Sequence, residues 1–117
     1  MYAFKNLIVW QKSIELVLAI YELTASYPKE EIYGLISQTR RAAVSVPSNI
    51  AEGRRRGSDP QYLHFLEIAL GSTAELETQL LLAKKLSFTI PERFTKSDEL
   101  LLEVVKMLGK MVYNRQT

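Results

Sequence analysis

The sequence predicts an all-α protein: an antiparallel up-down-up-down bundle of four helices in one domain, residues 1–117. Apolar residues recur at helical spacing in four segments, and short stretches containing glycine, proline or serine separate these segments. No alternation of apolar and polar residues is long enough to indicate a β-strand. With 117 residues and 47% apolar content, the chain is long enough for one core and too short for two.

The first predicted helix runs from about residue 7 to residue 26. Asn6 is expected to cap it, and Phe4 to act as a hydrophobic staple. A first apolar stripe follows steps of three and four residues, and a second stripe lies beside it on the helical wheel. The first stripe comprises Leu7, Trp10, Ile14, Val17 and Tyr21, and the second comprises Val9, Leu16, Ile20 and Leu23.

The second predicted helix runs from about residue 30 to residue 56. Its acidic start and arginine-rich end agree with the helix macrodipole. Pro47 lies inside it and removes one backbone hydrogen bond, so we expect either a kink near Pro47 or two abutting helices. Small residues around Pro47 would allow another backbone to approach closely. The predicted apolar face comprises Leu35, Ala42, Val46, Ile50 and Gly53.

A turn at residues 57–60 separates the second helix from the third, which is expected over about residues 60–86. Gly57 closes one helix, Ser58 or Asp59 caps the next, and Pro60 suits its first turn. After a break at residues 87–91, a fourth helix is expected over about residues 92–114. The predicted apolar faces are Phe65, Ala69, Leu76 and Leu80 in the third helix, and Leu101, Val104, Leu108 and Met111 in the fourth.

The helices carry more apolar surface than one bundle core requires, because a surface helix needs a stripe only about 100° wide. This excess predicts subunit interfaces in a closed, symmetric homo-oligomer. The alternative is a monomer with a thick core and some exposed leucines. The residues that widen the faces are the second stripe of the first helix, Leu63, Leu66, Leu70 and Leu81 in the third helix, and Leu100, Leu102 and Val105 in the fourth.

The composition argues against an enzyme and against a metal or cofactor site. The chain has no cysteine, and its single histidine, His64, cannot form a metal-ligand cluster. His64 and Glu67 share a helical face but form a solvated pair more readily than a catalytic one. The longest uninterrupted apolar run, residues 16–21, is too short to cross a membrane. We therefore expect a cytoplasmic protein without catalytic residues, cofactor or membrane contact.

The charge distribution points to an anionic partner. The formal net charge is only +2, but residues 38–57 contain five arginines and one glutamate, a local charge of +4 that leaves −2 for the remainder. This basic window favours nucleic-acid binding through phosphate contacts, with affinity that falls as salt rises. The candidate binding residues are Arg40, Arg41, Arg54, Arg55 and Arg56.

Each group of arginines also has a purely structural interpretation. Arg40 and Arg41 have no acidic residue at neighbouring helical positions. At least one of them is therefore expected to pair with a carboxylate of the third helix, and the candidate partners are Glu67, Glu75 and Glu77. The three consecutive arginines at residues 54–56 would compensate the dipole of the second helix, with Glu52 or Asp59 as partners.

A resemblance to a known family is carried by residues 33–53 (YGLISQTRRAAVSVPSNIAEG), followed by Arg54, and by residues 65–77 (FLEIALGSTAELE). These strings closely resemble the bacterial four-helix-bundle family known from proteins encoded within 23S rRNA intervening sequences. The opening residues 4–10 (FKNLIVW) resemble the start of the same family.

This resemblance implies a four-helix bundle that assembles into a ring-like homo-oligomer, with a homopentamer as the expected form. The related accessory variability proteins of diversity-generating retroelements have a basic surface and bind nucleic acid and a reverse transcriptase. Our leading hypothesis is a homo-oligomer that contacts RNA or DNA phosphates without reading base sequence. The alternative is an oligomeric protein-interaction scaffold that binds no nucleic acid.

Overall fold

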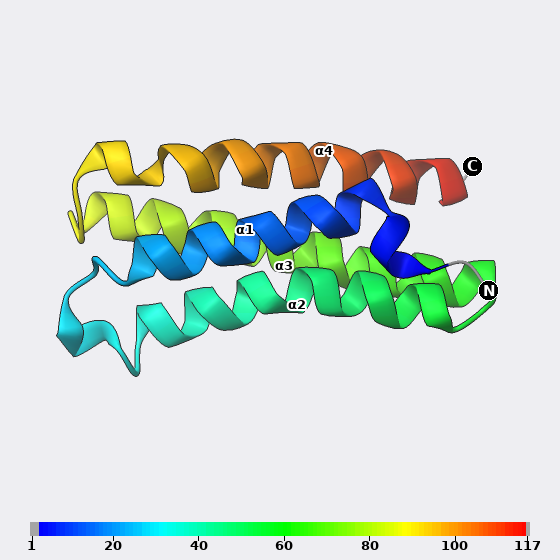
Figure 1. The fold of residues 1–117 in the computed structure, drawn as a ribbon, viewed down its shortest axis with the longest axis horizontal. Helices are drawn as coiled ribbons and strands as arrows, with labels where there is room; N and C mark the ends of the chain where they lie inside the picture. The colour runs from blue at the N-terminus through cyan, green and yellow to red at the C-terminus, as the bar shows by residue number, and fades with distance from the viewer. Residues whose placement is uncertain (1–2, 117) are drawn as a thin grey trace.

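Four long helices joined by short connections make up the computed structural model, which describes residues 3–116 (Figure 1). No strand occurs among these residues. The bundle measures 43 × 22 × 20 Å. In chain order the elements are η1 (Phe4–Asn6), α1 (Ile8–Thr24), η2 (Lys29–Glu31), α2 (Leu35–Arg55), α3 (Asp59–Lys85), η3 (Pro91–Phe94) and α4 (Thr95–Gln116), where η denotes a 3-10 helix.

The four helices form an up-down-up-down bundle, as the sequence predicts. α1 packs against α2 and α4, and α3 packs against the same two helices. The α1–α2 and α3–α4 connections lie at one end of the bundle, and the α2–α3 turn lies at the other (Figure 1). Each helix therefore runs antiparallel to the two helices beside it, while α2 and α4 run in the same direction.

The core face of α1 is the second of its two apolar stripes. Leu16 and Ile20 are fully buried, whereas Trp10 of the first stripe is half-buried and Tyr21 is exposed. The sequence predicts two adjacent stripes, and the structure buries the second more deeply than the first. Ser13 is also buried in this stripe, and because it is polar the apolar pattern is interrupted at this position in the sequence. Its hydroxyl donates a hydrogen bond to the Trp10 carbonyl at 2.7 Å. This local hydrogen bond allows a polar residue to be buried here.

The predicted cap of α1 is wrong. Asn6 is the last residue of η1, so the N-cap of α1 is Leu7 instead. The Leu7 side chain makes no capping hydrogen bond. The Phe4 ring instead packs edge-on against Trp10, with 5.3 Å between the ring centroids. η1 therefore lies beside the start of α1, where Gln11 Nε2 donates to the Lys5 carbonyl.

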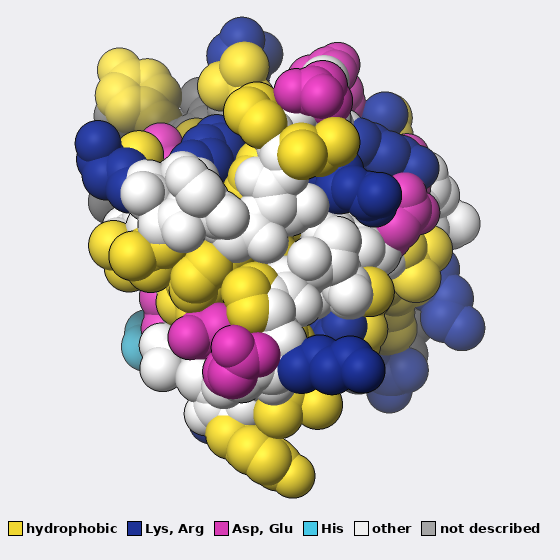
Figure 2. Space-filling view, turned by 90° about the vertical axis from the view of Figure 1, so that its left-hand side faces the viewer, with side chains coloured by type: hydrophobic (Ala, Val, Ile, Leu, Met, Phe, Trp, Pro, Cys, Tyr) yellow, Lys and Arg dark blue, Asp and Glu magenta, His cyan; other side chains and the backbone are white. Residues whose placement is uncertain are grey.

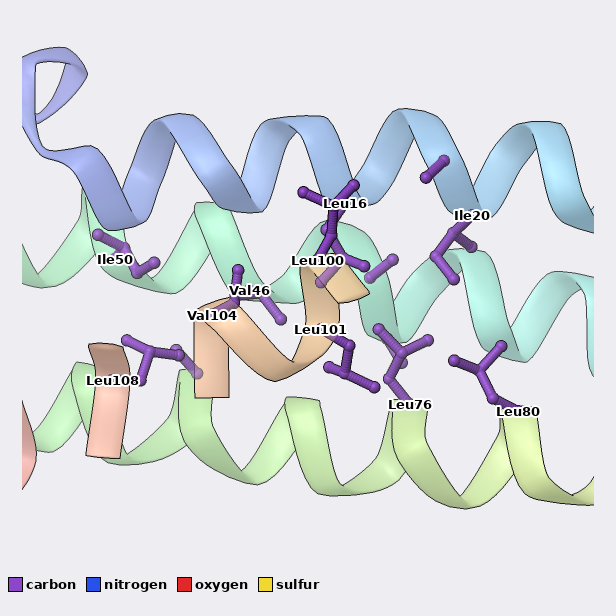
Figure 3. Close-up of a cluster of buried hydrophobic side chains, with 14 of the residues drawn as sticks. Leu16, Ile20, Val46, Ile50, Leu76, Leu80, Leu100, Leu101, Val104 and Leu108 are labelled. Carbon is purple, nitrogen blue, oxygen red and sulfur yellow. The ribbon is translucent and has the colours of Figure 1, made fainter. Parts of the chain in front are cut away.

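The other three helices bury the faces that their periodicity predicts, and their leucine, isoleucine and valine side chains meet between the helices (Figure 3). Met111 and Phe65 lie at the edges of these faces and are half-buried. The central residues labelled in Figure 3 are Leu16 and Ile20 of α1, Val46 and Ile50 of α2, Leu76 and Leu80 of α3, and Leu100, Leu101, Val104 and Leu108 of α4.

α2 is one continuous helix through Pro47, which is buried. The alternative of two abutting helices is therefore wrong, and a kink at Pro47 stays a prediction. α2 also begins later than predicted, because residues 29–31 form the separate helix η2. The N-cap of α2 is Gly34. Glu31 Oε1 accepts a hydrogen bond from the Leu35 backbone N–H at 3.2 Å and satisfies one donor of the first turn.

The α2–α3 turn has the predicted chemistry. Gly57 has a φ of 82°, a left-handed conformation that favours glycine, and Ser58 caps α3 by accepting from the Gln61 backbone N–H at 3.4 Å. Just before the turn, a Cβ on Gly53 would lie 2.6 Å from the Phe65 Cβ. Only glycine therefore allows α2 and α3 to approach this closely near the turn. Further along, the Ser45 and Ser72 hydroxyls are hydrogen-bonded at 2.8 Å.

Much of the excess apolar surface is absorbed by the core of the single chain. Leu66 and Leu100, expected to widen the faces of their helices, are buried, as is the second stripe of α1. Leu81 and Leu102 remain 51% and 55% exposed and line a groove of about 560 Å³ between α3 and α4. The half-buried Val105 also lines this groove. Here, residues of the predicted excess apolar surface lie together and reach the solvent.

Candidate nucleic-acid interface

Four of the five candidate arginines lie on α2 and Arg56 is its C-cap, and the five occupy two separate places. Arg40 and Arg41 are in its first half, and Arg54 and Arg55 are in its last turn. Arg40 and Arg54 are fourteen residues apart, which corresponds to about 20 Å along a helix axis. The basic window in the sequence is therefore not one patch on a single chain.

Arg40 braces α2 against α1. Its Nε donates to the Thr24 hydroxyl at 2.8 Å, and its Nη2 donates to the Tyr21 carbonyl at 3.4 Å. The guanidinium also lies over the Tyr21 ring, 4.5 Å from the centroid. These contacts confirm a bracing role, but the partners are neutral groups of α1.

The predicted partners on α3 were wrong for Arg40. Glu67, Glu75 and Glu77 are all exposed on α3. α2 presents small residues to α3, including Gly53 and Ser45, while the Arg40 side chain turns to α1 on its other flank. Acidic positions in the sequence could not reveal these partners, because the two Arg40 donors that bond to α1 have a hydroxyl and a carbonyl as acceptors.

Arg54, Arg55 and Arg56 each lie over an aromatic ring at the α2–α3 end. The centroid distances are 5.5 Å from Arg54 to Tyr62, 5.4 Å from Arg55 to Phe4, and 5.0 Å from Arg56 to Phe65. These rings come from η1 and the first two turns of α3. Stacking orients a guanidinium while leaving its N–H edge available for hydrogen bonds.

Glu52 is the acidic partner that the sequence predicts within the helix. Its Oε2 accepts a hydrogen bond from Arg56 Nε at 2.9 Å and forms an ion pair with Arg56 Nη2 at the same distance. Asp59 lines a small hollow of about 250 Å³ together with Arg54 and Arg55. The positive charge of this region is therefore partly offset, and most strongly at Arg56.

A fourth arginine joins this end from α4. The Arg115 guanidinium lies 4.6 Å from the centroid of the Tyr62 ring, which Arg54 also contacts. We call Arg54, Arg55, Arg56 and Arg115 the arginine end cluster. Sequence reasoning missed Arg115 because it lies outside the basic window. The topology was the available signal, since α2 and α4 run parallel and both end here.

The opposite end of the bundle has no comparable concentration of one charge. Figure 2 shows that end, with basic, acidic and hydrophobic side chains interspersed over the α1–α2 and α3–α4 connections. Lys84 and Asp98 form an ion pair there at 2.7 Å, and its exposed basic residues include Lys29, Arg93 and Lys96.

Other polar groups do not form a recognisable catalytic arrangement within residues 3–116. His64 is exposed and contacts the Phe65 ring edge-on at 5.2 Å between centroids. An acidic hollow of about 470 Å³ lies between α1 and α4, lined by residues that include Glu15, Glu22 and Glu99. No group of three histidine, aspartate or glutamate side chains in the described chain is placed to hold a metal ion. None of its helices has the length and apolar character of a membrane span.

Fold and surface together define a four-helix-bundle protein with an arginine-rich end. The chain belongs to the 23S rRNA-intervening sequence protein family, whose sequence model matches residues 5–110. No curated protein matches it. Among solved structures, a protein of unknown function from the S23 ribosomal protein family of Bacteroides thetaiotaomicron is similar with a TM-score of 0.79 and 23% identity. The alignment covers 90% of this chain and 98% of that one, so the two share the fold.

Proposed function

We propose that this protein is a non-enzymatic homo-oligomer that binds the phosphate backbone of RNA or DNA through the arginine end cluster. The observation that carries the proposal is the placement of four guanidiniums, from the C-terminal ends of α2 and α4 and the C-cap of α2, over aromatic rings at one end of the bundle. Each ring limits the motion of an arginine before a ligand arrives, which lowers the entropic cost of binding.

Phosphate contacts fit this cluster better than base recognition does. Arginine forks match phosphate oxygens, and contacts to the backbone carry no sequence information. The aromatic rings lie beneath the guanidiniums, and Tyr62 is buried, so it offers no open platform for stacking a base. Binding is therefore expected to be sequence-independent and strongly dependent on salt.

Assembly would multiply this modest patch. The exposed leucines of the α3–α4 groove support a subunit contact, and symmetry would then repeat the arginine end cluster around a ring. Several weak sites on one particle bind a long polyanion far more tightly than one site does. The family name refers to 23S rRNA, so structured RNA is a natural first ligand to test.

The competing explanation is that the arginines only compensate helix dipoles. α2 and α4 both end here, and cations near helix C-termini are stabilising by about 0.3–1 kcal/mol. This explanation predicts a stability effect when the arginines are neutralised and no effect on RNA or DNA binding, so one set of variants separates the two.

The test is fluorescence anisotropy with labelled RNA and DNA of mixed sequence, from about 50 to about 200 mM salt. The triple variant Arg54→Gln, Arg55→Gln, Arg56→Gln should bind at least about tenfold more weakly at low salt. Its plot of log affinity against log salt should be less steep by about two to three, because each lost phosphate contact removes about 0.7–0.9 from the slope.

A charge-matched control keeps the net charge of the triple variant but leaves the cluster intact. It carries Lys29→Gln, Arg93→Gln and Lys96→Gln at the opposite end and should bind like wild type. Equal losses in both triple variants would mean that overall charge, not this site, attracts the nucleic acid. Unchanged binding in the arginine variant would leave dipole compensation as the role of the cluster.

A further inference from the structure

A second surface with its own chemistry lies between α1 and α2. This hollow has a volume of about 410 Å³, within the range of roughly 300–1,000 Å³ that is typical of small-ligand sites. Arg40 and Arg41 line it together with apolar side chains, and none of the lining residues is acidic. We call it the α1–α2 hollow.

The apolar lining of the α1–α2 hollow reaches the surface. Ile32 is 54% exposed, Tyr21 42% and Val44 40%, although all three stand beside a positive charge. An occupant gains the most free energy if it buries these groups and supplies a negative charge in the same place. The two requirements together define the chemistry of the partner.

The two arginines can both contribute to binding an anion. Two of the five N–H donors of Arg40 are used on Thr24 and Tyr21, which leaves three and holds the guanidinium in place. Arg41 is the next residue along α2, and its side chain is exposed. One oriented and one exposed guanidinium lining the same hollow suit a carboxylate, which accepts hydrogen bonds at both oxygens.

We infer that the α1–α2 hollow docks an acidic segment of a partner protein, one with leucine or isoleucine next to glutamate or aspartate. A nucleic-acid backbone would satisfy the arginines but would place polar sugar and phosphate against Ile32 and Val44. A peptide supplies carboxylate and aliphatic groups on adjacent residues. This site lies about 20 Å along α2 from the arginine end cluster, so it stands independently of nucleic-acid binding there.

The test uses N-acetyl-leucyl-glutamate as the probe and saturation-transfer NMR on the full-length protein as the readout. Saturation should reach the leucine methyl groups of this dipeptide. N-acetyl-leucinamide, which lacks the carboxylates, and N-acetylglutamate, which lacks the aliphatic group, should each bind about tenfold more weakly. Equal binding of all three probes would overturn the inference, because the hollow would then not combine the two chemistries.

Two variants locate the probe. Arg41→Gln removes one charge from an exposed position, and Val44→Ser removes part of the apolar wall; each should weaken dipeptide binding about tenfold. Arg54→Gln, with the same charge change at the arginine end cluster, should bind the dipeptide like wild type. If Arg41→Gln and Val44→Ser both bind normally while melting like wild type, the dipeptide sits elsewhere and the inference fails.

Displacement of the dipeptide by competitors and the light-scattering mass of the protein distinguish a partner protein from nucleic acid or a second copy of the chain. A short RNA or inorganic phosphate that displaces the dipeptide at equal concentration would assign the hollow to nucleic acid and overturn the inference. A drop in light-scattering mass in Arg41→Gln would assign it to a second copy of the chain and overturn it as well. Unchanged mass, together with displacement by acidic leucine-containing peptides alone, is the result expected for a partner protein.

Discussion

Tyr27 is a buried tyrosine whose hydroxyl is a sensitive test of the core. Its ring packs against Phe88 and Phe94 beyond the end of α1, and its hydroxyl is buried with no hydrogen-bond partner among the described residues. Burial, together with the negative charge of Asp98, raises the pKa of Tyr27 to about 12. Both features follow from placing a phenol in an apolar corner of the bundle.

The substitution Tyr27→Phe should stabilise the protein by about 1 kcal/mol at neutral pH, since it removes a buried hydroxyl that lacks a partner. It should also change the alkaline response. An unfolded tyrosine ionises near pH 10 and the folded one near pH 12, so the unfolded state loses its proton first. The wild-type free energy of unfolding is therefore unaffected by Tyr27 ionisation below about pH 10, and it falls as the pH rises from about 10 toward 12.

Urea unfolding of wild type and Tyr27→Phe at pH 7, 10 and about 11.5 measures this difference. The advantage of the variant should grow by about 2 kcal/mol over the alkaline range. Tyr33→Phe is the matched control, because Tyr33 is 95% exposed. A stability difference that stays constant with pH would show that Tyr27 ionises equally in both states.

At the scale of elements, Arg40 links α2 to α1 through two hydrogen bonds and a cation–π contact. The Arg40 guanidinium donates a hydrogen bond to the buried Thr24 hydroxyl and lies over the Tyr21 ring. Arg40→Ala should therefore destabilise the protein by about 1–2 kcal/mol, from one charge-assisted hydrogen bond and one cation–π contact. The urea midpoint checks this value.

Arg41→Ala makes the same change one residue further along α2 at an exposed position. It should alter stability by less than about 0.5 kcal/mol. Comparable losses in the two variants would mean that the charge of the first half of α2 matters and that the brace does not. A larger loss in Arg40→Ala ties the stability to its contacts with α1.

The elements also show where sequence reasoning succeeds. The α2–α3 turn was predictable because Gly57 and Ser58 have conformational and hydrogen-bonding preferences that act within a few residues. The buried face of α1 was not, because two apolar stripes share one helical period and only packing against α2 and α4 selects between them. Ser13 looked polar in the sequence, yet its local hydrogen bond lets it be buried.

The candidate site followed the same division. Sequence identified the arginines at residues 54–56 and the Glu52 partner of Arg56, since these lie within one helical turn. It could not join Arg115 to them, because that contact spans α2, α3 and α4 and depends on their relative directions. It also joined Arg40 and Arg41 to the same patch, although the rise of one helix separates the two groups.

At the scale of the whole molecule, the α3–α4 groove is the candidate surface for assembly. Leu81 and Leu102 line it and stay half-exposed, and Val105 adds to the apolar part of the lining, while Glu77, Lys84 and Asp98 add charged groups. Neighbouring exposed apolar side chains rimmed by polar ones are typical of a protein interface, whereas a single exposed leucine is ordinary. The groove is thus the surface of this chain on which we expect assembly to depend.

Light scattering should give a mass well above the 13.4 kDa of one chain, and about 67 kDa for the homopentamer, five times that mass. The double variant Leu81→Glu, Leu102→Glu should shift the mass toward 13.4 kDa, because two carboxylates would be buried without partners in the assembled groove. Both positions are exposed in the single chain, so its helix content should be retained.

Leu18→Glu is the control for added charge on an exposed leucine. Leu18 is 65% exposed on α1 and is not among the residues that line the α3–α4 groove. Its variant should keep the wild-type mass. A wild-type mass of 13.4 kDa would instead establish the thick-cored monomer, and the arginine end cluster would then have to bind nucleic acid without the gain from repetition.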